Sequence, residues 1–241
     1  ITLRQNAAED RAYIESCFGR SIYPPERLRK AEQELCTGAH LGCRLWFAAG
    51  VPSPEQAPTP EAKHLAEQAQ LQAGRNRAYY SKNLELHRSV ELRLTEQIRN
   101  CILVHQQPNA RIARSGSLDA DRVWRAIRLN DSRVFRCAEE ENHPSFTVDL
   151  LLDASASRLH CQEVIAAQGA ILARSLAACN IPVRVSAFSS LRGYTVLRVL
   201  KRFSDKKLQG IDQYFASGWN RDGLALRAAG DLAAFDPGPA S

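Results

Sequence analysis

Methionine is absent from this chain of 241 residues, although a typical usage of about 2% would supply around five. A sequence from which modified methionines had been omitted would show such a lack. Long apolar runs are missing as well: no stretch approaches the roughly 20 apolar residues that a helix needs to cross a bilayer. Nor does a secretory signal peptide open the chain. We therefore expect a cytoplasmic protein that does not contact a membrane.

Catalytic signatures are also lacking. No Gly-x4-Gly-Lys-Ser/Thr motif is present to cradle a nucleotide phosphate, so the chain is not expected to hydrolyse ATP itself. The seven cysteines are scattered and odd in number, which favours reduced thiols over a disulfide framework. Adjacent residues on a helix do not face each other, which argues against a nucleophilic pair of His160 and Cys161. We expect neither catalytic residues nor a small-molecule substrate.

The charge balance is basic, with a net charge of +6 and an isoelectric point near 9.1. Such a surplus is compatible with nucleic acid or with acidic proteins as partners. However, the basic residues are spread widely and often neighbour acids, as in Glu91-Leu-Arg93, and no recognised nucleic-acid-binding motif accompanies them. We therefore do not expect nucleic acid, although RNA binding through the basic helical region remains an alternative.

Residues 1–132 are predicted to form a mostly helical N-terminal region. Four prolines between Val51 and Pro60 indicate a linker near 51–60. From Glu61 to His105, apolar side chains at four-residue spacing predict one or two long amphipathic helices with a break near Gly74. Ser117 and Asp119 then offer N-cap chemistry for a short helix near 123–127.

Residues 133–241 show strands alternating with helices. An alternating edge strand is expected at 133–137 and a buried strand ending in an unbroken apolar run at 145–153. Further strands are expected at 181–188 and 194–200, with helices at 161–179 and 223–234. This order predicts an α/β domain with a mainly parallel, Rossmann-like sheet flanked by helices.

The end of the buried strand carries the chemistry. Ligands of open α/β sheets bind beyond the carboxyl ends of the strands, which is where Asp153 lies. Ser155 and Ser157 follow at alternate positions, so both hydroxyls can turn towards one point. One carboxylate and two hydroxyls, with room for water, suit Mg²⁺ or a similar hard divalent cation.

This pattern resembles the metal-ion-dependent adhesion site of the von Willebrand factor A (vWA) family, which begins Asp-x-Ser-x-Ser after the first core strand. The resemblance carries Asp153, Ser155 and Ser157 over as metal ligands. A second family loop contributes a threonine in many members; here Asn220 or Asp222 stands at the matching place. The third family loop, an Asp after another apolar strand, has no counterpart. We therefore expect a vWA domain at 133–241 whose C-terminal strands are missing from the sequence.

Segments around the metal loops are similar to bacterial vWA proteins of the nitric oxide reductase activation and aerobic cobaltochelatase group. They are Val148–Ser157, Ile181–Val185, Gly193–Val196 and Gly218–Ala225. The resemblance implies a metal-dependent protein-interaction module that works beside a MoxR-type AAA+ ATPase. In that reading, an acidic residue of the partner completes the metal's coordination. A non-catalytic subunit of a cobalt or magnesium chelatase is the alternative.

The N-terminal region offers a second candidate metal site. Cys36, His40 and Cys43 could supply three zinc ligands, with Cys17 as a fourth. Tetrahedral zinc sites usually combine two short ligand pairs of the Cys-x2–4-Cys or His-x3–5-His type. This sequence offers only one such segment, which mixes Cys and His. The competing interpretation is that Cys36 and Cys43 are small buried hydrophobic residues and that His40 is a capping or surface residue.

Overall fold

The computed structural model describes residues 6–105, 110–138, 146–205 and 209–238. Its centre is a four-stranded sheet in the order β1-β7-β6-β5, formed by β1 (Arg44–Ala48), β5 (Val148–Asp153), β6 (Val183–Leu191) and β7 (Tyr194–Lys201). The outer pairs β1–β7 and β5–β6 are parallel, and the central pair β6–β7 is antiparallel. The fold is therefore α/β with a mixed, mostly parallel sheet, as the alternation of strands and helices predicts.

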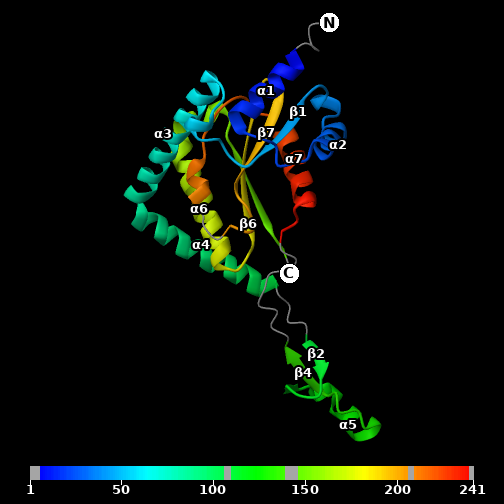
Figure 1. Ribbon diagram of the computed structural model, residues 1–241. Coiled ribbons are helices and arrows are strands. Elements are labelled where there is room, and N and C mark those ends of the chain that lie inside the picture. The colour runs from blue at the N-terminus through cyan, green and yellow to red at the C-terminus, as the bar shows by residue number, and fades with distance from the viewer. Residues whose placement is uncertain (1–5, 106–109, 139–145, 206–208, 239–241) are drawn as a thin grey trace.

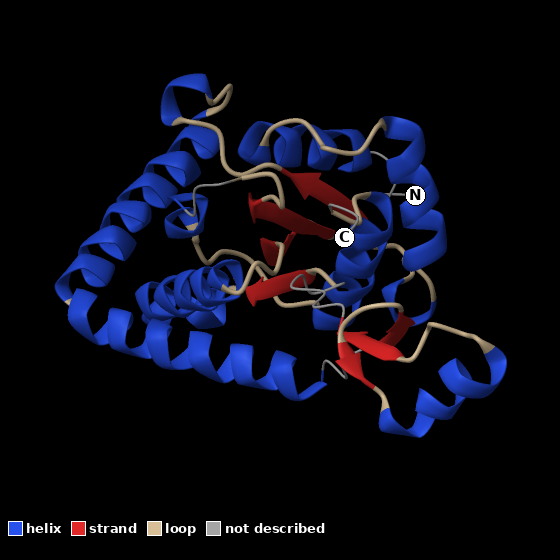
Figure 2. Cartoon of the chain, turned by 90° about the horizontal axis from the view of Figure 1, so that it is seen from below, coloured by secondary structure: helices blue, strands red, loops and turns tan. Residues whose placement is uncertain are grey.

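Helices cover both faces of this sheet (Figures 1 and 2). On one face, α6 (Gln162–Ala178) packs on β5 and β6, and α3 (Pro60–Lys82) and α4 (Leu84–His105) pack against α6. On the other face, α7 (Asp222–Phe235) contacts β5 and β7, and α2 (Pro25–Leu35) contacts β1 and α7. The remaining N-terminal helix, α1 (Asn6–Phe18), packs against α3.

The antiparallel pair arises from a tight hairpin. Arg192 and Gly193 both have positive φ, 47° and 79°, as a two-residue hairpin turn requires. Such a turn can only return the chain antiparallel to itself. The two strands expected near 181–188 and 194–200 are thus present, but they are direct neighbours without an intervening helix.

A second, three-stranded antiparallel sheet has the order β2-β4-β3. It consists of β2 (Ala110–Ala113), β3 (Ser117–Leu118) and β4 (Phe135–Ala138), with the short helix α5 (Val123–Leu129) inserted between β3 and β4. The strand expected at 133–137 is present as β4, but it pairs with β2 and β3 in this second sheet and not with the strands of the central sheet.

Strand pairing crosses the domain boundary that the sequence predicts at 132/133. The N-terminal region is mostly helical as expected, yet β1 within it pairs with β7 along five registered residues. Leu45, Trp46 and Phe47 are almost fully buried in one hydrophobic core that they share with Val196, Leu197 and residues of α7. Residues of α1, α2 and β1 therefore share one hydrophobic core with the C-terminal strands, whereas β2 and β3 belong to the second sheet.

The long helical segment breaks at Asn83 and not at Gly74. α3 continues through Gly74 because its neighbours Ala73 and Asn76 are buried against the body, which offsets the low helix propensity of one glycine.

The 51–60 segment is irregular as predicted, apart from the short 3₁₀ turn Pro54–Gln56. Thr59 then caps α3 by accepting a hydrogen bond from the backbone N–H of Ala62 at 3.2 Å.

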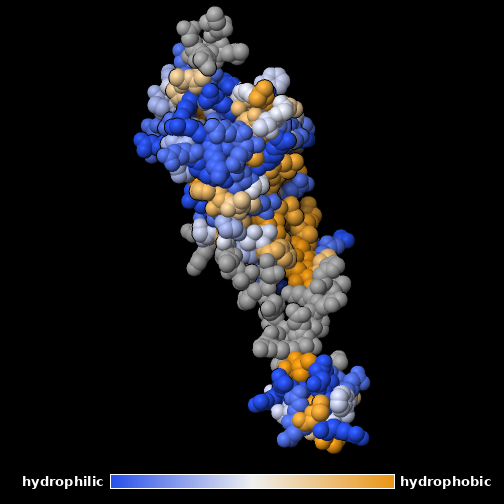
Figure 3. All heavy atoms as spheres, turned by 90° about the vertical axis from the view of Figure 1, so that its right-hand side faces the viewer, coloured by the Kyte–Doolittle hydropathy of each residue, from blue (hydrophilic) through white to orange (hydrophobic). Residues whose placement is uncertain are grey.

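On one side the sheet ends at β5, which pairs within the described residues only with β6. Most β5 side chains are only partly buried, and α7 beside it exposes Leu226 and Phe235. Apolar side chains gather on the face of the molecule where α7 lies (Figure 3). Among the described residues, no helix combines the length and apolarity needed to cross a membrane.

Candidate metal-binding loop

Asp153 ends β5, and its carboxylate lies at the carboxyl edge of the parallel β5–β6 pair. The backbone N–H of Ser155 donates to Oδ1 of Asp153 at 2.9 Å. The guanidinium of Arg158 donates from Nε to Oδ2 at 2.8 Å and forms an ion pair with it. Both carboxylate oxygens therefore have a partner, and one of these partners is a cation.

The two serines of the loop point towards each other. Their Oγ atoms lie 2.9 Å apart, although Ser155 is buried and Ser157 is exposed. Ser155 has extended backbone angles and Ser157 lies in the 3₁₀ helix Ala156–Cys161, so the chain turns sharply between them. Asp153, Ser155 and Ser157 thus present a carboxylate and two hydroxyls in one small region, as their alternate spacing predicts.

Neighbouring segments hold the backbone of this loop at several points. Ala154 donates to the carbonyl of Phe188 in β6 at 2.9 Å, and Ser217 donates to the carbonyl of Ala154 at 2.7 Å. The backbone N–H of Ala156 donates to the carbonyl of Gly218 at 2.9 Å. The hydroxyl of Tyr214 donates to the carbonyl of Asp153 itself. The segment 214–218 and β6 therefore hold the loop together.

Gly218 is required by this close approach. Its φ is +73°, and an added Cβ would lie 2.5 Å from the carbonyl oxygen of Ser190. Directly after it, Trp219 exchanges two backbone hydrogen bonds with Ser190, at 2.7 and 2.8 Å. The Trp219 side chain is 80% exposed beside the loop.

The other two predicted ligands lie just beyond this bridge. Asn220 and Asp222 are both exposed, and Oδ1 of Asn220 accepts a hydrogen bond from the backbone N–H of Asp222 at 3.0 Å. Within the described part of the chain, neither side chain is hydrogen-bonded to Asp153, Ser155 or Ser157. The geometry therefore brings three of the five predicted oxygen ligands together, whereas the Asn220 side chain accepts a backbone hydrogen bond just before α7.

The electrostatics of the loop favour an ionised carboxylate. Burial alone would raise the pKa of Asp153, but the hydrogen bonds from Ser155 and Arg158 outweigh it, and the pKa lies below its ordinary value. The same hydrogen bond raises the pKa of Arg158. An ionised carboxylate and two hydroxyls are a hard oxygen set of the kind Mg²⁺ prefers, and Arg158 is the cation that such an ion must displace or accommodate.

The Asp-x-Ser-x-Ser pattern includes neither Arg158 nor Tyr214, although both side chains bind Asp153 in the structure. Arg158 directly follows the Asp-x-Ser-x-Ser pattern, so its position was a usable signal. Tyr214 is separated from Asp153 by a helix and two strands, and no local pattern marks it.

The proposed zinc ligands do not converge in the structure. Cys36 is buried at the end of α2, where burial raises the pKa of its thiol to about 11 and the nearby carboxylate of Glu32 adds to the effect. Cys43 accepts a hydrogen bond from Arg221 at 3.0 Å. The His40 ring faces α7: a Cβ added at Gly223 would lie 3.1 Å from its Nε2. The described residues contain no group of three His, Cys, Asp or Glu side chains that could hold a metal, so the zinc hypothesis gains no support.

An open groove of about 590 Å³ adjoins the candidate loop. One wall is the first turns of α3 with Tyr13 of α1, and the other is formed by Ala156, Leu159 and the segment 215–218. Leu159 is half exposed at its rim. This groove joins segments far apart in sequence, which is why the sequence alone did not indicate it.

Comparisons with known proteins add little to this description. No family model matches the sequence, and no curated protein matches it. A crystal structure of an uncharacterised protein from Alicyclobacillus acidocaldarius is similar at 17% sequence identity with a TM-score of 0.34. The similarity covers 92% of this chain and 90% of that one. It is too distant to support an argument about function.

Proposed function

We propose that this protein is a non-catalytic, metal-ion-dependent interaction module that binds an acidic side chain of a protein partner at the Asp153 loop. The observation that carries the proposal is the 2.9 Å approach of the Ser155 and Ser157 hydroxyls beside the Asp153 carboxylate. Asp153, Ser155 and Ser157 would hold the ion. A bound divalent ion supplies an electrophilic position that attracts a carboxylate.

The surroundings suit a protein partner. Trp219 and Leu159, 80% and 54% exposed, flank the loop, and exposed aromatic side chains are enriched in protein interfaces. The adjacent groove of about 590 Å³ is open and could receive a peptide segment. The family resemblance, together with this loop, makes a MoxR-type AAA+ ATPase the partner that we propose.

Arg158 stabilises the metal-free state of the loop. Its guanidinium neutralises the Asp153 carboxylate at 2.8 Å, and its half-exposed side chain is free to leave towards solvent. A divalent ion therefore competes with a tethered cation, which lowers the apparent affinity for the ion.

Titration of the protein with Mg²⁺ by isothermal calorimetry tests the metal site. We expect Asp153→Ala and Ser155→Ala to abolish binding. Asp131→Ala is a matched control, because Asp131 likewise accepts a backbone N–H two residues ahead and pairs with an arginine, but it lies outside the Asp-x-Ser-x-Ser pattern. Mg²⁺ binding that survives Asp153→Ala would overturn the assignment of the site.

The interaction itself is tested with a fluorescent, glutamate-rich peptide. We expect its anisotropy to rise with the protein in Mg²⁺ and to return to the free value in EDTA. Peptide binding that is unaffected by EDTA would contradict the metal-dependent mode.

A further inference from the structure

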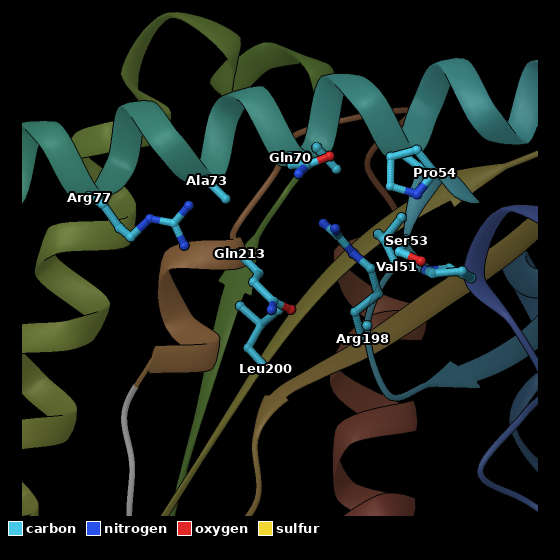
Figure 4. Close-up of a pocket in the computed structure, with 13 residues that line it drawn as sticks. Val51, Ser53, Pro54, Gln70, Ala73, Arg77, Arg198, Leu200 and Gln213 are labelled. Carbon is cyan, nitrogen blue, oxygen red and sulfur yellow. The ribbon is translucent and has the colours of Figure 1, made fainter. Parts of the chain in front are cut away.

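Arg198 is a fully buried arginine in the middle of β7. Its cross-strand neighbours are Ala187 on β6 and Ala48 on β1, and these small side chains leave space around the guanidinium. The side chain extends from the sheet towards α3 (Figure 4). Its relative exposure is 0%.

This charge has no counter-ion among the residues that the structure describes. Nη2 donates to the carbonyl of Phe215, whereas Nε and Nη1 have no hydrogen-bond partner. Burial lowers the pKa of Arg198 to about 10, so the side chain remains protonated at neutral pH. Tyr214 acts on it electrostatically, but burial raises the pKa of that phenol, which is therefore uncharged.

Arg184 is a second buried arginine of the sheet, and unlike Arg198 it is paired with carboxylates. Arg184 on β6 is 1% exposed in side chain and donates to both carboxylate oxygens of Asp149, with Nη2 to Oδ2 at 2.9 Å. Asp236 accepts a further hydrogen bond from Arg184. Since an unpaired buried charge is strongly unfavourable, the contrast indicates that an anion from outside the chain pairs with Arg198.

A cavity of about 300 Å³ adjoins this guanidinium. It exists because α3 faces the sheet there with Ala66, Ala69 and Ala73, and the proline-rich segment 51–54 closes one side. The exposed amides of Gln70 and Gln213 border it and can supply further hydrogen bonds. The volume is at the lower end of the range for small-molecule sites, with mostly apolar walls and a few polar groups.

The charge of the ligand follows from the two arginines that line the cavity. Arg77 is already paired with Asp212 at 3.2 Å, so Arg198 supplies the one uncompensated positive charge. A single negative charge balances it, which disfavours a phosphate dianion. The alanine, proline and leucine walls require an apolar body on the ligand.

We propose that this cavity binds a small organic monocarboxylate whose carboxylate accepts hydrogen bonds from Arg198 while its apolar body packs against α3. This site is separate from the Asp153 loop and does not depend on the proposed metal. It departs from the expectation, drawn from the sequence, that no small molecule is bound.

Sodium butyrate and sodium benzoate are suitable probes, with sodium chloride and inorganic phosphate at equal ionic strength for comparison. We expect butyrate and benzoate to raise the melting temperature of the protein and to show binding in isothermal calorimetry. Chloride and phosphate should do neither. Equal stabilisation by chloride, or tighter binding of phosphate, would overturn the proposal.

Three variants locate the site. Arg198→Met should weaken butyrate binding about tenfold or more, because a charge-assisted hydrogen bond is lost. Ala69→Leu fills the cavity while leaving Arg198 in place, and it should abolish binding; this variant decides the matter if Arg198→Met does not fold. Arg75→Met removes a charge from the exposed side of α3 outside the cavity and should bind normally. Butyrate binding that persists in Ala69→Leu contradicts the assigned site.

Discussion

Nε of Arg158 lies 2.8 Å from Oδ2 of Asp153, so the carboxylate proposed to hold a divalent ion already has a cationic partner five residues along the chain. The Asp-x-Ser-x-Ser pattern is therefore only part of the local electrostatics. Affinity for an ion at this loop depends on the balance between the free ion and the tethered guanidinium. The first prediction concerns that balance.

Replacing Arg158 with alanine should raise the affinity of the protein for Mg²⁺. The arginine is half exposed, so the competing ion pair is weak and the expected gain is roughly two- to fivefold. Isothermal calorimetry of Arg158→Ala measures it, and Arg158→Lys, which keeps the charge, should stay closer to the natural protein. Weaker Mg²⁺ binding in Arg158→Ala would show that the arginine supports the site.

The pH dependence of stability should report the depressed pKa of Asp153. A carboxyl whose pKa is lower in the folded than in the unfolded state stabilises the fold above the unfolded value, about 3.9, and this contribution is lost as the pH falls through the folded value. Asp153→Asn should therefore reduce the free energy of unfolding at pH 7 by no more than about 1 kcal/mol, because solvent screens the partly exposed pair. Urea unfolding at pH 7 and in strong acid should show the difference vanishing in acid. A difference that grows in acid would contradict the sign.

The two buried arginines should respond in opposite ways to substitution. Arg184→Met leaves Asp149 without its partner and should lower the free energy of unfolding by about 2–4 kcal/mol. Arg198→Met removes a buried charge that has no counter-ion among the described residues, so the loss should stay below about 1 kcal/mol or become a gain. Urea unfolding in a buffer without organic carboxylates measures both. Equal losses would mean that Arg198 has a counter-ion within the chain.

Local patterns in the sequence were sufficient to predict the segments nearest to the candidate loop. The apolar run before Asp153 predicts β5, and the alternate serines predict hydroxyls that approach each other. The pairing of β1 with β7 could not be predicted in this way, because strand pairing depends on contacts between distant segments. The sequence of Arg44–Ala48 does not indicate which strand lies beside it.

The position of the helix break shows the same limit. Gly74 is a poor helix former, yet burial of its neighbours keeps α3 continuous until Asn83. Arg198 is visible in the sequence as a charged residue within the apolar run Tyr194–Leu200. Only the structure shows that, in the part of the chain it describes, no carboxylate pairs with this charge.

Gly218 offers a test of how strictly the loop geometry is set. An alanine there must adopt φ of +73° and would place its Cβ 2.5 Å from the Ser190 carbonyl oxygen, so the segment 217–219 has to move. We expect Gly218→Ala to lower the free energy of unfolding by about 1–3 kcal/mol. It should also weaken Mg²⁺ binding, since Gly218 accepts the hydrogen bond from Ala156 between the two serines.

Gly74→Ala is the matched control. A Cβ at this mid-helix position meets no atom within 4 Å, so the variant should stabilise the protein by about 0.5–1 kcal/mol. Chemical unfolding and Mg²⁺ titration of both variants measure these effects. If Gly218→Ala binds Mg²⁺ as the natural protein does, the 214–218 segment does not position the serine hydroxyls.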